Sequence, residues 1–148
     1  MKLLALLFFA FFGLSTVKAQ CDTEVREAFG GVSSITIYNT YITIGAIADA
    51  HVNEVYDAAR VKELMGEQTS MLQAVIDMLD KCKVVKSNGL SADDVEYVKD
   101  LIVCLQSLKA EAQGLSDYAA TQSEDAQNRY NTNRDKAWSE IKTLMGLE

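Results

Sequence analysis

The chain of 148 residues contains no proline, one histidine and three cysteines. An all-β domain of this size places prolines in turns and on edge strands, so their absence favours helices. The one histidine, His51, has no second imidazole or thiolate three or four residues away, and we expect it on the surface rather than on a metal. No two of the three cysteines have CxxC spacing, which argues against a zinc or thioredoxin-like site.

The sequence also lacks catalytic motifs and an excess of positive charge. It has no glycine-rich phosphate loop and no serine motif of the hydrolase type. Its 14 basic and 21 acidic residues give a net charge of −7. Nucleic acids and anionic membranes require clustered Lys and Arg, so both are excluded as expected partners. We therefore expect a protein that is not an enzyme, needs no cofactor or metal, and acts by binding.

The N-terminus does carry a clear pattern. Lys2 precedes an unbroken apolar run, Leu3–Leu14, and Val17 and Ala19 are small residues at the −3 and −1 positions of a cleavage site before Gln20. The run is too short for a membrane span, which needs ~20 residues. The sequence thus predicts a signal peptide over residues 1–19, export to an oxidising space, and one domain over residues 20–148.

The odd number of cysteines in the mature chain predicts one disulfide and one buried thiol. In a helical hairpin turning at residues 87–91, Cys82 lies ~6 Å from the turn and Cys104 ~20 Å, whereas a disulfide needs Cα atoms within ~7 Å. Cys21 lies on a short segment that can reach either residue. We predict a Cys21–Cys104 bond, with Cys82 as the alternative partner or a free thiol. A thiol that joins two chains is the other alternative.

Apolar periodicity predicts a disulfide-tied, all-α bundle of about four main helices after a break at Gly30-Gly31. Ser33 or Ser34 can cap the first helix. The β-branched stretch 35–44 also suits a strand, but a lone strand would have no partner, so we predict helix. The predicted stripe is Ile35, Tyr38, Ile42, Gly45, Ala48, Val52, Val55 and Ala59, which leaves Ile37, Ile44 and Ile47 for a partner helix.

The second helix separates from the first either at Gly66 or at a slightly earlier turn, and Lys86–Gly89 should end it. Its apolar residues recur every three or four positions. The stripe comprises Val61, Leu64, Gln68, Met71, Val75, Met78, Cys82 and Val85, widened by Met65, Leu72, Ile76 and Leu79.

For the third helix, Ser91 and Asp94 form a capping-box pattern, and Gly114 should end it. The last segment, Asp117–Met145, should be helical but loosely held in its polar middle, because few apolar groups are available there. The third helix should bury Val95, Val98, Leu101, Ile102, Leu105, Leu108, Ala112 and Leu115, and the last should bury Ala137, Trp138, Ile141, Leu144 and Met145.

Four acidic residues gather at the start of the third helix. A calcium site would need them in a loop with a turn glycine, so a solvated helix start or a docking point for a basic protein fits better. The candidate partner-binding residues are Asp93, Asp94, Glu96 and Asp100.

Two other functions remain open. A carrier of a small apolar ligand would use a cavity between the helices, although Met and aromatic stripes usually form plain core. A structural or self-associating secretion would use the surplus cysteine and the isoleucines of residues 35–47. The cavity candidates are Tyr38, Tyr41, Met65, Met71, Met78 and Trp138.

The chain resembles the salivary inhibitors of blood-feeding insects, such as the anophensin-type mosquito proteins. The resemblance covers the whole mature chain and consists of gross features, namely a preceding signal peptide, the length, the helicity and the small number of cysteines. This resemblance implies a stoichiometric inhibitor of a host defence cascade, such as complement or contact activation. It carries over no individual residue.

Overall fold

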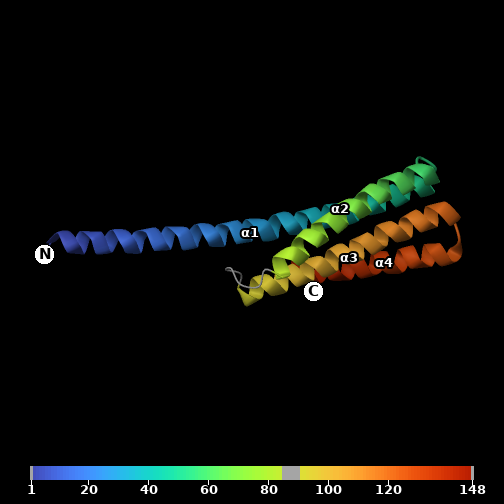
Figure 1. Cartoon of the computed structure of the whole chain (residues 1–148). Coiled ribbons are helices and arrows are strands. Elements are labelled where there is room, and N and C mark those ends of the chain that lie inside the picture. Colours follow the sequence, from blue (N-terminus) through green and yellow to red (C-terminus); the bar gives the residue numbers. More distant parts are fainter. Residues whose placement is uncertain (1, 85–90, 148) are drawn as a thin grey trace. The chain divides into compact units, whose positions relative to one another are not determined.

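A computed structural model shows the protein as a set of α-helices (Figure 1). It describes residues 2–84 and 91–147, and the side chains of residues 24–81 and 91–147. These residues form four helices and no strand, so the predicted all-α class is confirmed. The chain divides into two compact units, Met1–Ile35 and Thr36–Glu148, and the division falls inside the first helix.

Helix α1 spans Lys2–Val52 and runs through Gly30-Gly31. The predicted break there is wrong, and so is the predicted cap. The hydroxyl of Ser33 donates to the carbonyl oxygen of Phe29 at 2.7 Å, a bond inside the helix. A glycine costs about 1 kcal/mol within a helix, so two of them weaken a helix without necessarily ending it.

The part of α1 in the second unit is helical over the ambiguous stretch, as predicted, but it buries a different face. Ile37 and Ile44 lie in the core, whereas Tyr38 and Ile42 are exposed. Ile37, Tyr41, Ile44 and Ala48 are spaced as regularly as the predicted stripe, and the stacking of Tyr41 on Trp138 of the last helix, α4 (Glu124–Met145), accompanies their burial. Ile37 and Ile44 are therefore not available to a partner helix.

A turn over residues 53–57 joins α1 to α2, which spans Ala58–Val84. Glu54 adopts a left-handed conformation (φ 60°), and the amide of Val55 donates to the carbonyl oxygen of Ala50 at 2.8 Å. Asp57 caps α2, because its Oδ1 accepts from the amide of Arg60 at 2.8 Å. The helices thus separate at the earlier of the two predicted positions.

Helix α2 buries Val61 of the predicted stripe, but from Met65 onward its buried face is rotated by about one residue, or ~100°, from that stripe. Met65, Leu72 and Ile76, which we expected at the margin, are buried, whereas Met71, Val75 and Met78 are exposed. The apolar residues of α2 occupy a wider sector of the helix surface than the neighbouring helices cover. The centre of that sector therefore does not coincide with the buried face. The side chain of Cys82 and the predicted stop at Lys86–Gly89 lie outside the described residues.

Helix α3 spans Ala92–Thr121 and α4 spans Glu124–Met145. The helix end predicted at Gly114 is wrong, since α3 continues to Thr121, and Gln122 then turns the chain with φ 51°. Ser123 then caps α4 by accepting from the amide of Ala126 at 3.3 Å. Gly114 allows close packing instead, because a Cβ atom there would lie 3.1 Å from the Cα atom of Tyr130.

The middle of α4 is not loosely held, which corrects the prediction from its polar sequence. Ala126 and Tyr130 are buried, and the Nδ2 of Asn133 donates to the carbonyl oxygen of Ala110 at 3.0 Å. Small residues and polar groups make these contacts. The prediction considered only large apolar residues and therefore did not detect them.

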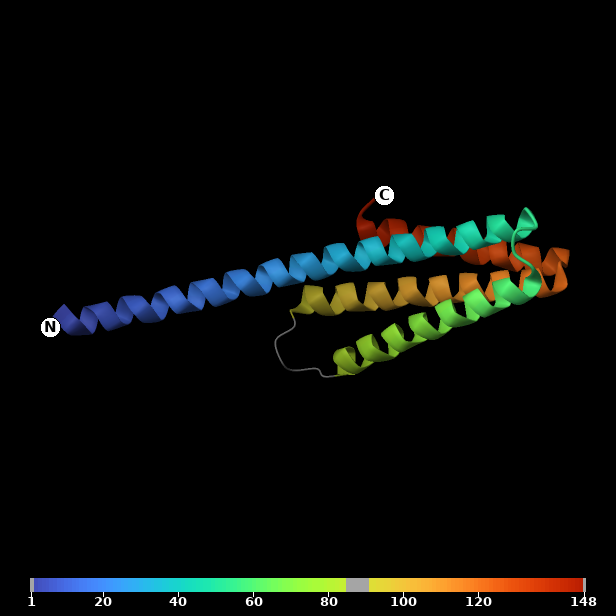
Figure 2. The ribbon, with the colours of Figure 1, turned by 90° about the horizontal axis from the view of Figure 1, so that it is seen from above.

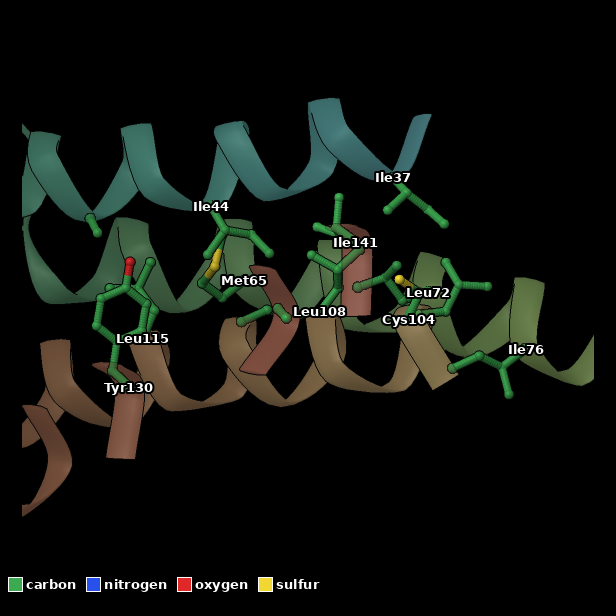
Figure 3. Close-up of a cluster of buried hydrophobic side chains, with 14 of the residues drawn as sticks. Ile37, Ile44, Met65, Leu72, Ile76, Cys104, Leu108, Leu115, Tyr130 and Ile141 are labelled. Carbon is green, nitrogen blue, oxygen red and sulfur yellow. The ribbon is translucent and has the colours of Figure 1, made fainter. Parts of the chain in front are cut away.

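Successive helices of the second unit run antiparallel (Figure 2) and share one core (Figure 3). Helix α3 packs against both α2 and α4, and most of its predicted stripe is confirmed as buried. Within the described part of the chain, no helix has the length and apolar character of a membrane span. The core comprises Ile37, Ile44, Ala48, Val61, Met65, Leu72, Ile76, Leu101, Ile102, Cys104, Leu105, Leu108, Ala112, Leu115, Ala119, Tyr130, Ala137 and Ile141.

Candidate functional site

The predicted acidic cluster lies at the start of α3, and two of its members serve the helix itself. The amide and hydroxyl of Ser91 both donate to Asp94 Oδ2 at 2.8 Å, and the amide of Asp94 donates to Ser91 Oγ at 3.1 Å. This reciprocal arrangement is the predicted capping box. Lys99 Nζ forms an ion pair with Glu96 Oε2 at 2.7 Å. Asp94 and Glu96 are therefore occupied within the helix.

The other two members, Asp93 and Asp100, are exposed. Asp93 lies in the first turn of α3, where a negative charge is favoured by the helix dipole. Among the described residues, no three acidic, histidine or cysteine side chains come close enough to hold a metal ion. Asp93 and Asp100 thus contribute an acidic surface at this end of α3.

Cys104 has no exposed surface, lies in the core shown in Figure 3, and has no disulfide partner among the residues whose side chains are described. Burial, together with the charges of Glu140 and Asp100, raises the pKa of this thiol to about 12. A thiol with such a pKa is a poor nucleophile at neutral pH, because the thiolate is the reactive form. The side chains of Cys21 and Cys82 lie outside the described residues. The pairing of Cys21 with Cys104 stays a prediction.

The residues expected to line an apolar cavity do not gather around one space. Met65 is buried in the core, and Met71 and Met78 are exposed. Only the aromatic residues meet: Tyr41 stacks on Trp138 with ring centroids 5.4 Å apart, and Tyr38 lies 6.4 Å from the same ring. These contacts join α1 to α4 as part of the packing.

Exposed apolar side chains instead follow the outer side of α2. Met71, Val75 and Met78 are 57%, 40% and 61% exposed, and their spacing of four and three residues places them on one stripe. Flexible Met side chains are common on surfaces that bind proteins, because they adapt to different shapes. We call these three residues the α2 stripe.

His51 is half-buried, which corrects its predicted place on the surface. Its Nδ1 lies 2.9 Å from the carbonyl oxygen of Tyr56, and its ring meets Tyr118 of α3 edge-on, with centroids 6.2 Å apart. The histidine thus helps to close the turn between α1 and α2.

Sequence reasoning missed a buried ion pair, Glu111 with Arg134. Glu111 of α3 has no exposed surface, and its Oε1 accepts from Arg134 Nη1 of α4 at 2.5 Å. Its other oxygen, Oε2, is buried without a hydrogen-bond partner. Glu111 follows Leu108 by three residues on the predicted buried stripe of α3, and this position was the available signal. Arg134 lies in a polar stretch that gives none.

Arg134 also contacts α1. Its guanidinium lies over the ring of Tyr41, 4.1 Å from the centroid, and Nη1 is 3.4 Å from the carbonyl oxygen of the same residue. Gly45 leaves room for this arrangement, since a Cβ atom there would lie 2.5 Å from Arg134 Nη2. The pair therefore joins α1, α3 and α4 at one point.

Burial dominates the electrostatics of this pair. Desolvation raises the pKa of Glu111 to about 7, although the hydrogen bond and the positive charge of Arg134 both act to lower it. Desolvation likewise raises the pKa of Tyr130, beside the pair, to about 12. Glu111 is thus a buried carboxyl group that changes charge near neutral pH.

A hollow of about 240 Å³ lies beside Arg134. Its walls come from α1, α3 and α4, and they combine small apolar residues with amides and two tyrosines. It is lined by Gly45, Ala48, Asp49, Val52, Tyr118, Gln127, Tyr130, Asn131 and Arg134.

No family model, curated protein or solved structure matches this chain.

Proposed function

We propose that this protein is secreted and acts without catalysis, as a stoichiometric binder of a basic extracellular protein. The α2 stripe is the observation that carries the proposal. Covering Met71, Val75 and Met78 would remove from water apolar surface that the bundle leaves exposed, which favours association by ~25 cal/mol per Å². An inhibitor of a host defence cascade is the kind of binder that the salivary resemblance suggests.

The acidic end of α3 supports a basic partner. The described end of α2 and the start of α3 lie at the same end of the bundle in both views (Figures 1 and 2), so the acidic start of α3 and the C-terminal part of α2 lie toward the same end of the second unit. Charge of one sign beside an apolar contact speeds the encounter with a partner of opposite sign. We propose that Asp93 and Asp100 steer the partner and that the α2 stripe holds it.

Secretion and a disulfide tie are part of the proposal. The predicted signal peptide at residues 1–19 would deliver the chain to an oxidising space, and the proposed Cys21–Cys104 bond would form there.

The first experiment compares two variants that each remove exposed apolar side chains. Immobilised wild type should capture one protein in fixed stoichiometry from serum, and Met71→Ser combined with Met78→Ser should lose most of it. Val103→Ser is the matched control, because Val103 is also exposed but lies on α3. Equal capture by both variants, or no captured protein with the wild type, contradicts the proposal.

The second experiment measures the association rate with the captured protein. Asp93→Asn combined with Asp100→Asn should slow association several-fold and reduce its dependence on salt, since exposed charges are screened within ~10 Å at 0.1 M salt. This pair spares the capping box that Asp94 forms. Asp117→Asn, an exposed acid toward the other end of α3, is the control and should leave the rate nearly unchanged.

Carriage of a small ligand is the second candidate, and the hollow beside Arg134 favours it. The lining includes Asp49, Gln127 and Asn131, so the ligand would be polar rather than the apolar one expected from the sequence. Native mass spectrometry of the purified protein tests this candidate, which a bound small molecule supports and a mass equal to that of the chain alone contradicts.

A further inference from the structure

The Glu111–Arg134 pair has three properties that a purely structural contact does not need. Glu111 is fully buried, one of its oxygens has no hydrogen-bond partner, and Arg134 remains 28% exposed. A buried carboxylate with an unsatisfied oxygen is costly to keep ionised, whereas a partly exposed guanidinium can turn toward water at little cost. The two partners thus differ in how firmly the fold fixes them.

We propose that Glu111 and Arg134 form a pH-sensitive latch, which holds Arg134 against Tyr41 of α1 while Glu111 is ionised and releases it when Glu111 takes up a proton. The ionised carboxylate attracts the guanidinium through a charge-assisted hydrogen bond, which is about twice as strong as a neutral one. A neutral carboxyl group can still accept a hydrogen bond, but it exerts no such charge attraction. Release concerns the Arg134 side chain and leaves the bundle folded.

The neighbouring groups leave Glu111 as the titrating member. Arg134 stays protonated at every relevant pH. Burial raises the pKa of both Tyr130 of α4 and Tyr41 of α1 above 10, so neither tyrosine ionises near neutrality. No group of α2 contributes to the raised pKa of Glu111, which has burial as its main cause and a value of about 7.

Two further carboxylates act on the surroundings rather than on Glu111 itself. The charges of Asp49 of α1 and Asp135 of α4 raise the pKa of Tyr130 and of Tyr41, respectively. Both are exposed, and a released Arg134 would find them or water nearby. The guanidinium of Arg134 can therefore interact with these carboxylates or with water when Glu111 is neutral.

The chain contains its own reporter of this movement. Trp138 is its single tryptophan, and it stacks on the ring of Tyr41 at 5.4 Å with an angle of 24° between the ring planes. Arg134 lies over that same Tyr41 ring. Loss of the cation from the ring should alter how Tyr41 packs and hence the fluorescence of Trp138.

The test is a titration of Trp138 fluorescence in the purified protein between about pH 5 and about pH 9. A Glu side chain with an unperturbed pKa is already ionised over nearly all of this range. The wild type should show one transition with a midpoint near pH 7, and Glu111→Gln should lose it while keeping wild-type helicity. A wild type without a transition, or a transition that survives in Glu111→Gln, overturns the proposal.

His51→Asn is the matched control, because it removes the chain's single histidine and leaves Glu111 and Arg134 in place. The ring of His51 contacts that of Tyr118, so this variant should keep the transition. Loss of the transition in His51→Asn would show that the histidine causes it and would contradict the proposal. Should Glu111→Gln fail to fold, Arg134→Met takes its place. With no cation to release, Arg134→Met should give a flat titration, and a persisting transition contradicts the proposal.

Discussion

Glu111 places two carboxylate oxygens inside the bundle, and their surroundings differ. Oε1 accepts from Arg134, whereas Oε2 has no partner. Removing one member of a buried ion pair typically destabilises a protein by ~3–5 kcal/mol, whereas replacing both members by well-packed apolar residues is often neutral. The ionised state of Glu111 is therefore the costly one, and this cost depends on pH.

The first prediction concerns stability against pH. Burial raises the pKa of Glu111 from 4.5 to about 7, so between these values the folded chain holds a proton that the unfolded chain has released. The contribution of Glu111 to the free energy of unfolding is complete below the lower value and is lost as the pH rises to about 7. Relative to Glu111→Gln, the wild type should lose a few kcal/mol, at about 1.4 kcal/mol per pKa unit.

Urea denaturation of both proteins at a series of pH values measures this difference. The two free energies of unfolding should diverge across the acidic range and run parallel above about pH 7. Parallel curves throughout would show that Glu111 has an ordinary pKa in the folded chain.

At the scale of the element, α2 shows how a wide apolar sector hides the buried face. Its sequence offers an apolar residue on nearly half of the circumference, and α3 covers only part of it. Leu72 is buried and Val75 is exposed, although they lie three residues apart. Which side of such a sector is buried depends on the neighbouring helices.

The second prediction follows from this rotation. Leu72→Asp should prevent folding, because an unpaired buried carboxylate costs several kcal/mol. Val75→Asp should fold with normal helicity and lose at most about 1 kcal/mol. Circular dichroism and thermal melting of the two variants check the assignment, and equal damage from both would show that the outer side of α2 is covered.

Features that depend on interactions between residues close in sequence could be predicted, whereas features that depend on contacts between helices could not. Ser91 and Asp94 gave the start of α3 from the sequence, because a capping box is a local interaction. The turn at Gln122 uses no glycine, and Gly114 serves the approach of α4, so the glycine rule misplaced the end of α3. Arg134 became a candidate only when the fold brought α1, α3 and α4 together.

At the scale of the whole molecule, the proposed disulfide between Cys21 and Cys104 requires export to an oxidising compartment. Cys104 lies in the centre of the core, so a bond to Cys21 would anchor the start of the mature chain to the interior. This bond and cleavage before Gln20 depend on export, and both leave a trace in the mass of the protein.

The third prediction is that the secreted protein begins at Gln20 and contains a Cys21–Cys104 bond. Intact mass and non-reducing peptide mapping measure both features. A bond between Cys82 and Cys104, or three free thiols, would contradict the pairing, and retention of residues 1–19 would contradict the cleavage. A free Cys104 should react with a thiol reagent only after unfolding, because it has no exposed surface.

The turns between successive helices have a consequence for folding kinetics. Residues 53–57 join α1 to α2, and Gln122 and Ser123 alone join α3 to α4, so each of these helix pairs closes through a short loop. Helical proteins dominated by local contacts fold in microseconds to milliseconds. The chain also contains no proline, so no prolyl isomerisation can delay its refolding by tens of seconds. The reduced chain should regain its helices in a single fast phase, and any slow phase in the oxidised protein would then report disulfide exchange.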